Sequence, residues 1–219
     1  MIGVLGGTFD PVHIAHLRCA LEVQHGLGLS EVRFVASRQP PHRPMPAASA
    51  HQRLAMLRLA IDAQPGFVVD DREIRREGPS YTVDTLQSLR DELGSAPICL
   101  IVGVDAFAGL HTWHRWTSLI ELAHLVVMHR PGRERVFTPD VQTLLNTRLV
   151  RDRSRLQQAP AGHIALLSVT QFEVSATRIR ALIGAGESVR YLVPDPVLDY
   201  IHREGLYRDA ASRALGSGA

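Results

Sequence analysis

Two histidines near the start of the chain, His13 and His16, have the residue type and spacing to bind phosphate. They follow a short apolar run and two glycines, Gly6 and Gly7, which let a backbone approach a ligand closely and turn sharply. Pro11 suits the turn or the start of a following helix. Histidines three positions apart lie on one face of the first turn of that helix. Because a helix N-terminus attracts anions, the sequence predicts a phosphate site here.

The same two histidines allow two other interpretations. They could be metal ligands, but a zinc site needs a third ligand, and no nearby acid or cysteine completes a clear set. They could also be a solvated pair at the end of a helix. We therefore predict no metal site formed by protein side chains.

The segment GGTFDPVHIAH at 6–16 matches the signature GG[ST]FDPxHxGH, so the chain resembles the nucleotidyltransferases that share the HxGH motif. Within that superfamily it is similar to the nicotinate-nucleotide adenylyltransferases. Further segments agree in order: PPHRP at 40–44, PSYTVDTL at 79–86, IVGVDAF at 101–107, TWHRW at 112–116, HRPG at 129–132, VSATRIR at 174–180 and LVPDPVLDYIHREGLYR at 192–208. The resemblance covers residues 1 to about 208 and departs from the motif at Ala15, where an added methyl group could crowd the nucleotide.

This resemblance implies an enzyme of NAD biosynthesis that joins ATP and nicotinate mononucleotide into nicotinate adenine dinucleotide (deamido-NAD), with release of pyrophosphate. Such a transfer needs positioning and charge neutralisation more than a protein nucleophile. The residues implied to be catalytic are Thr8, His13 and His16. The residues implied to bind ATP are Gly6, Gly7, Thr8, Phe9, His13, His16, Gly103, Asp105, Ser175, Thr177 and Arg180. Mg²⁺ carried with ATP is the expected cofactor, held by phosphate oxygens and water.

Several residues of the ATP side also have structural interpretations. Ser175 and Thr177 could simply cap the helix that follows them. Asp10 could cap the helix after the glycine pair. Asp105 lies just past a buried strand, and the resemblance implies that it binds the ribose. Its carboxylate can accept hydrogen bonds from the ribose hydroxyls. Arg178 falls at a variable position, so we expect it to face solvent.

The residues implied to bind nicotinate mononucleotide are Arg43, Thr82, Trp113, His114 and Arg130. Trp113 has a shape suited to stacking on a flat ring, although a half-buried packing role is the alternative. The family places the ring carboxylate against backbone N–H groups near Thr82 and His114, and such donors favour a carboxylate over a carboxamide. His111 and His114 could mimic a metal pair, but a loop and helix start explain them more simply.

Composition narrows the class of protein. The 219 residues are 45% apolar and 21% charged, as expected for an ordinary globular chain. All 24 basic residues are arginine, so mechanisms that need a P-loop, Schiff-base or adenylylated lysine are excluded. The formal charge of +2 with scattered arginines argues against nucleic-acid binding. Without a signal sequence or a run of ~20 apolar residues we expect no membrane partner and a cytoplasmic location.

Short apolar, β-branched runs alternate with helical patterns along the chain. The runs predicted as strands are 2–5, 32–35, 67–69, 98–102, 125–128 and 164–167. The segments predicted as helices are 50–63, 82–93, 118–123, 174–184 and 196–204, besides the helix after the glycine pair. The alternation predicts an α/β fold with a Rossmann-like doubly wound parallel sheet and a small helical C-terminal portion. Ligands then bind at the carboxyl ends of the strands, near the topological switch point.

We expect one nucleotidyltransferase domain over 1–208, with the helical portion at about 174–208 and a flexible tail at 209–219. Cys19 and Cys99 form no spacing motif and are expected to be packed thiols. The sequence leaves open whether the chain forms a homo-oligomer. Two rival functions also stay open: another adenylyl- or cytidylyltransferase of the superfamily, such as one acting on phosphopantetheine, and a non-catalytic nucleotide-binding regulator.

Overall fold

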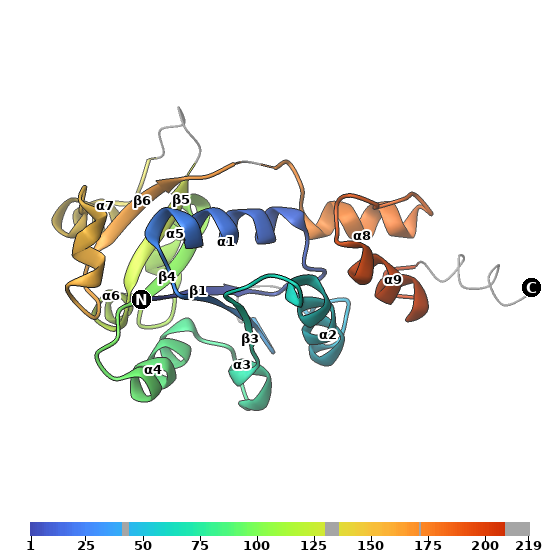
Figure 1. The fold of residues 1–219 in the computed structure, drawn as a ribbon, viewed down its shortest axis with the longest axis horizontal. Helices are drawn as coiled ribbons and strands as arrows, with labels where there is room; N and C mark the ends of the chain where they lie inside the picture. The colour runs from blue at the N-terminus through green and yellow to red at the C-terminus, as the bar shows by residue number, and fades with distance from the viewer. Residues whose placement is uncertain (41–43, 130–135, 171, 209–219) are drawn as a thin grey trace, which may run out of the picture.

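The computed structural model describes residues 1–40, 44–129, 136–170 and 172–208, which form a six-stranded sheet (Figure 1). The strands are β1 (Ile2–Gly7), β2 (Glu31–Ala36), β3 (Phe67–Asp70), β4 (Ile98–Gly103), β5 (His124–His129) and β6 (Ile164–Ser168). Every neighbouring pair is parallel, in the order β3-β2-β1-β4-β5-β6. The predicted doubly wound parallel sheet is therefore confirmed, and its strand order reverses between β1 and β4.

Helices occupy most of the segments between the strands. They are α1 (Ile14–Leu27), α2 (Ala50–Ile61), α3 (Arg72–Arg75), α4 (Thr82–Leu93), α5 (Val104–Ala108), α6 (Leu119–Leu122), α7 (Pro139–Arg148), α8 (Ala176–Gly184) and α9 (Asp195–Arg203). Short 3-10 turns are η1 (Leu110–Thr112), η2 (Trp116–Ser118) and η3 (Arg153–Gln157). Local signals explain the ends of the long helices. Ser49, for example, accepts a hydrogen bond from the Gln52 N–H at the start of α2, and Gly28 ends α1 in the left-handed conformation.

Apolar side chains pack on both faces of the sheet. On one face, α1, α2, α8 and α9 pack with strand residues such as Phe34 and Ile101. On the other, α4 to α7 pack with residues such as Leu100 and Leu125. Cys99 lies in the first of these two clusters, and burial raises the pKa of its thiol to about 12, so it is an inert packing residue. Cys19 is also unpaired, as expected.

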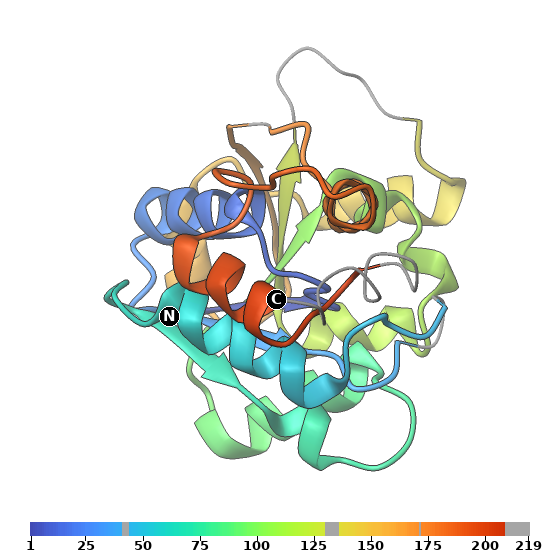
Figure 2. The same ribbon diagram turned by 90° about the vertical axis from the view of Figure 1, so that its right-hand side faces the viewer.

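The last two helices lie beyond the carboxyl ends of the strands, and α9 packs against α2 (Figures 1 and 2). They therefore border the edge of the sheet where a ligand is expected. Residues 209–219 lie outside the described residues, and the division into a domain, a helical portion and a tail stays a prediction. Among the described residues, no helix combines the length and apolar character needed to cross a membrane.

Three helices were not predicted from the sequence: α3, α5 and α7. The first two have 4 and 5 residues, too few to show a helical period. Helix α7 begins with Pro139 at its first position, which is a recognisable start signal. The helix predicted at 118–123 is instead the 3-10 turn η2 followed by α6, and the one predicted at 50–63 ends at Ile61.

Candidate active site

The connection from β1 to α1 forms the centre of the candidate site. Strand β1 continues through Gly7, so it is longer than predicted, and the glycine pair does not make the sharp turn. The turn lies instead at Phe9, which has a φ of 49° and is followed by a cis peptide bond between Asp10 and Pro11. Phe9 is buried and its ring packs against Phe34 of β2. Pro11 therefore belongs to the turn, and α1 begins three residues later.

Gly6 and Gly103 lie at the carboxyl ends of the neighbouring strands β1 and β4, at the switch point of the sheet, and each borders open space among the described residues. A Cβ atom built on either glycine would meet no atom of the described residues within 4 Å. Neither glycine has a positive φ, so the backbone conformation does not demand glycine there. A Cβ on Gly7, by contrast, would lie 2.9 Å from the Phe9 ring. The space beside Gly6 and Gly103 is therefore where a ligand can approach the backbone closely.

His13 and His16 stack on each other at the start of α1, with ring centroids 3.7 Å apart and planes 23° apart. The backbone N–H of His13, the N-cap residue, donates to Nδ1 of His16 over 3.3 Å. This hydrogen bond places the proton of a neutral His16 ring on Nε2. His13 is only 5% exposed, and burial lowers its pKa to about 4. His13 is thus a neutral imidazole at the positive end of a helix.

The N-terminus of α8 meets the β1–α1 connection from the other side. Ser175 is the N-cap residue of α8, and its hydroxyl accepts from the Arg178 N–H over 3.2 Å, as the capping interpretation predicts. Arg180 donates through Nη1 to the Asp10 carbonyl over 2.7 Å and through Nη2 to the Thr177 hydroxyl over 3.5 Å. The structure therefore joins two segments that are 170 residues apart in the sequence.

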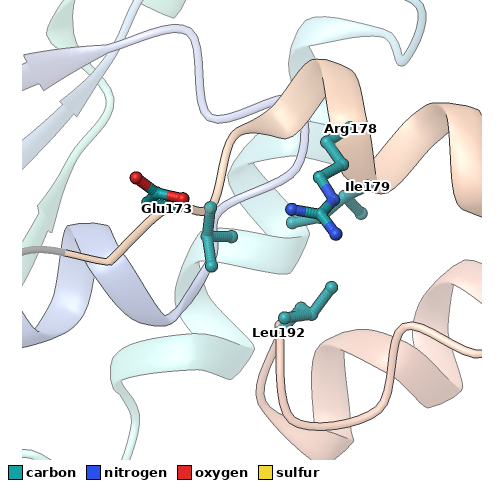
Figure 3. A pocket seen from close by; sticks show the side chains of 5 residues that line it. Glu173, Arg178, Ile179 and Leu192 are labelled. Carbon is teal, nitrogen blue, oxygen red and sulfur yellow. The ribbon is translucent and has the colours of Figure 1, made fainter.

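A small hollow of about 90 Å³ opens beside this end of α8 (Figure 3). It is lined by Glu173, Val174, Arg178, Ile179 and Leu192. Arg178 is exposed, as expected, and its guanidinium group extends across the hollow toward Leu192. The Leu192 carbonyl also accepts from the N–H of Ile14, the first residue of α1. The hollow thus adjoins the first residues of α1 and α8.

Three of the five residues predicted for the mononucleotide, Thr82, Trp113 and His114, lie in or near the start of α4. Thr82 is the first residue of that helix, and the ring of Tyr81, its N-cap, lies 4.3 Å from the ring of His114. Trp113 is half-buried and packs on the core beneath α4, so its packing role is real whether or not it also stacks on a ligand. Arg43 and Arg130 lie outside the described residues.

Comparisons with known proteins show the family of this chain. The model of the cytidylyltransferase-like family matches residues 4–182. A probable nicotinate-nucleotide adenylyltransferase of Methylococcus capsulatus is 51% identical over 208 residues, which are 94% of this chain and 99% of that protein. One from Aeromonas salmonicida is 48% identical and covers 94% of this chain and 97% of its own length.

The chain belongs to the nicotinate-nucleotide adenylyltransferase family. A solved structure of the Plasmodium falciparum nicotinic acid mononucleotide adenylyltransferase, complexed with NaAD, superposes with a TM-score of 0.71 and covers 94% of this chain and 96% of that one. At 17% identity this likeness shows the shared fold alone.

In this member of the adenylyltransferase family, Asp10 does not cap α1, so the alternative interpretation of Asp10 as a helix cap is wrong. The N-cap residue is His13. Its carboxylate is 4% exposed and accepts hydrogen bonds from the N–H groups of Ala47 and Ala48, at 2.8 and 3.1 Å, ahead of α2. It also accepts from the Tyr207 hydroxyl at 2.8 Å and lies 3.7 Å from Arg180 Nη1. Asp10 therefore fixes the β1–α1 connection to α2, α8 and the residues after α9.

Arg53 of α2 is a second residue of this network that the sequence interpretation missed. It is 0% exposed, and its guanidinium donates to the carbonyls of Thr8, Arg38 and Ala48, at 2.6, 3.3 and 3.3 Å. A signal was present in the sequence, since Arg53 shares the apolar face of α2 with Leu57, four residues on. A buried arginine needs such partners, so it marks a point where the site is held in place.

The adenylyltransferase site contains no cage for a metal ion within the described residues. There, no three His, Cys, Asp or Glu residues lie close enough together to hold one. His111 and His114 thus belong to no such group. This donor set fits a divalent cation that arrives with ATP and is held mainly by phosphate oxygens and water.

Proposed function

We propose that this chain transfers the adenylyl group of ATP to nicotinate mononucleotide in NAD biosynthesis. A phosphate oxygen of the mononucleotide attacks the α-phosphorus of ATP, the bond from that phosphorus to the bridging α–β oxygen breaks, and pyrophosphate leaves. The products are nicotinate adenine dinucleotide and pyrophosphate. The relatives named above support this reaction, and NaAD, in complex with the Plasmodium protein, is its dinucleotide product.

One observation carries the proposal most directly: the stacked pair His13 and His16 lies at the N-terminus of α1, where the strand order reverses. Helix N–H groups and imidazole N–H groups can converge there on a phosphate. The reaction needs its charge to be neutralised and its two substrates to be aligned, and alignment can supply roughly 7–11 kcal/mol of the barrier. No protein nucleophile is required.

The roles on the ATP side follow from position. His16, with its proton on Nε2, donates to the phosphate oxygens that gain charge as pyrophosphate leaves, and His13 and the Thr8 hydroxyl lie beside it. Ser175, Thr177 and Arg180 approach the triphosphate from α8. Gly6, Gly7 and the Phe9 backbone line the nucleotide, and Gly103 and Asp105 take the ribose.

The roles on the mononucleotide side follow from the start of α4. The N–H groups at Thr82 and near His114 donate hydrogen bonds to the ring carboxylate, and Trp113 stacks on the ring. A carboxamide would turn its NH₂ toward one of these donors and leave both unsatisfied. Nicotinate mononucleotide is therefore the preferred substrate over nicotinamide mononucleotide. Arg43 and Arg130 complete the phosphate contacts of this substrate.

Mg²⁺ is the cation we propose to accompany ATP, and when bound it neutralises triphosphate charge. The residues that adjoin it are those that hold the phosphates, chiefly His13, His16 and Arg180. A location in the cytoplasm, small-molecule substrates without nucleic acid or membrane, and the question of a homo-oligomer stay predictions.

The test measures pyrophosphate release by the purified protein with ATP and Mg²⁺. Nicotinate mononucleotide, nicotinamide mononucleotide and phosphopantetheine are offered in separate reactions. Release with the nicotinate substrate, at a much higher kcat/KM than with the amide, is the expected result. Release with phosphopantetheine alone would assign the chain to another transferase of the superfamily. A folded protein that binds ATP and releases no pyrophosphate with any of the three would support a regulator instead.

A further inference from the structure

Glu73 is a buried carboxylate that neither the sequence motifs nor the proposed reaction explains. It lies on the short helix α3, is 7% exposed, and burial raises its pKa. Burying a carboxylate costs several kcal/mol unless its oxygens are well hydrogen-bonded. Its partners therefore show what the carboxylate is for.

Two hydroxyl groups lie against Glu73. Thr85, in the second turn of α4, donates to Glu73 Oε1 over 2.5 Å, and Arg76 Nη2 in turn donates to the Thr85 oxygen over 3.2 Å. The hydroxyl of Ser80, two residues before α4, lies close enough to the carboxylate to lower the Glu73 pKa by hydrogen bonding. One carboxylate thus contacts the start of α4 at two residues, on either side of Tyr81 and Thr82.

Ser80 also forms hydrogen bonds with the segment after β2. Its oxygen accepts from the N–H groups of Arg38 and Gln39, at 3.0 and 3.3 Å, and its own N–H donates to the Gln39 carbonyl over 3.0 Å. The hydroxyl oxygen has two lone pairs, so it can accept both bonds while its proton stays available to the Glu73 carboxylate. A group that donated to Ser80 would turn that proton around and compete with both N–H groups.

We propose that Glu73 is a positioning residue for the mononucleotide: through Ser80 and Thr85 it holds the α4 N-terminus and residues 38–40 in the geometry that binds the pyridine carboxylate. The proposal rests on the proposed function for the identity of that ligand. The positioning itself is a property of the free protein and can be measured without substrate. Glu73 makes no contact with substrate in this scheme and is not a catalytic residue.

The substitution Glu73→Gln tests the proposal because it keeps the shape and one acceptor oxygen but adds an NH₂ donor. We expect faster hydrogen–deuterium exchange in residues 38–40 and 79–86 and little change in α8 and α9. We also expect the KM for nicotinate mononucleotide to rise on the order of tenfold, the equivalent of 1.4 kcal/mol, with the KM for ATP nearly unchanged. The preference for the nicotinate over the nicotinamide substrate should fall.

Glu92→Gln is the matched control. Glu92 lies near the other end of α4 and makes ion pairs with Arg33 and Arg72, at 2.8 and 2.7 Å, but it contacts neither Ser80 nor Thr85. We expect it to leave both KM values and the exchange of residues 38–40 unchanged. If Glu73→Gln fails to fold, Ser80→Ala carries the same test, since it removes the link to residues 38–40 and leaves the bond from Thr85.

The outcomes separate this proposal from the proposed function. Unchanged exchange in both segments would overturn the positioning, whatever the protein catalyses. Faster exchange with an unchanged KM for the mononucleotide, or an equal rise in both KM values, would overturn the link to the binding site. A wild-type protein inactive on nicotinate mononucleotide would overturn the proposed function and, with it, the ligand named here, while the exchange result would still decide the positioning.

Discussion

Replacing Tyr207 with phenylalanine should destabilise the protein at the Asp10 network. The Tyr207 hydroxyl donates to Asp10 Oδ1 over 2.8 Å, and burial beside that carboxylate raises the pKa of the phenol, so it stays a donor at any working pH. A hydrogen bond to a charged group contributes about 1.5–3 kcal/mol. For a chain of this size each kcal/mol shifts Tm by roughly 2–4 °C. We therefore expect Tyr207→Phe to lower Tm by about 3–12 °C.

The assay pairs thermal unfolding with pyrophosphate release. Tyr200→Phe is the control, because the Tyr200 ring lies on α9 under the Arg203 guanidinium, 5.1 Å away, and does not contact Asp10. Its expected change is within about 0.5 kcal/mol. We also expect Tyr207→Phe to lower kcat, since Asp10 holds the connection that carries His13. A Tyr207→Phe protein as stable and as active as Tyr200→Phe would refute this reasoning.

Three further predictions concern the two substrates and pH. His16→Ala should lower turnover on the order of 10²–10³, as for loss of one preorganised donor, whereas alanine at the exposed His25 of the same helix should not; equal turnover in the two variants would remove His16 from the mechanism. Trp113→Ala should raise the KM for the mononucleotide far more than that for ATP, and equal effects would indicate packing only. Burial lowers the pKa of His13 to about 4 in the folded protein. As pH falls below about 6.5, His13 therefore takes up a proton in the unfolded chain before it does so in the folded protein. About 3 kcal/mol of stability is then lost between pH 6.5 and 4, and urea unfolding of His13→Gln should lack that loss; a His13→Gln protein with the same pH dependence as wild type would contradict it.

The sheet could be predicted because its evidence is local. Each strand is a short apolar run, and a parallel sheet buried on both faces leaves that signature in the strand itself. The pairing of His13 and His16 could be predicted for the same reason, since the two residues fall within one turn of one helix. The exact turn was not, because the φ of 49° at Phe9 depends on how its ring packs against β2.

The groups that hold the site together could not be predicted in this way. Asp10 and Tyr207 are 197 residues apart, and no periodicity relates them. Many N–H groups along the chain could donate to the Asp10 carboxylate, so the sequence was equally consistent with Asp10 as a helix cap. Arg53 and Glu73 left weaker signals, a charge on an apolar helix face and a charge beside a turn. Only the folded chain shows that each has several partners.

Arg53 and Glu73 together explain how the two halves of the site keep their distance. Arg53 donates to the carbonyls of Thr8, on the proposed ATP side, and of Arg38. Ser80, beside Glu73 on the proposed mononucleotide side, accepts from the N–H of the same Arg38. The backbone at residue 38 thus has a contact on each proposed substrate side, one directly from buried Arg53 and one from Ser80, which lies beside buried Glu73. An in-line transfer depends on the separation of the attacking oxygen and the phosphorus. A network that joins both binding segments through one backbone position is a physical means of fixing that separation before either substrate binds.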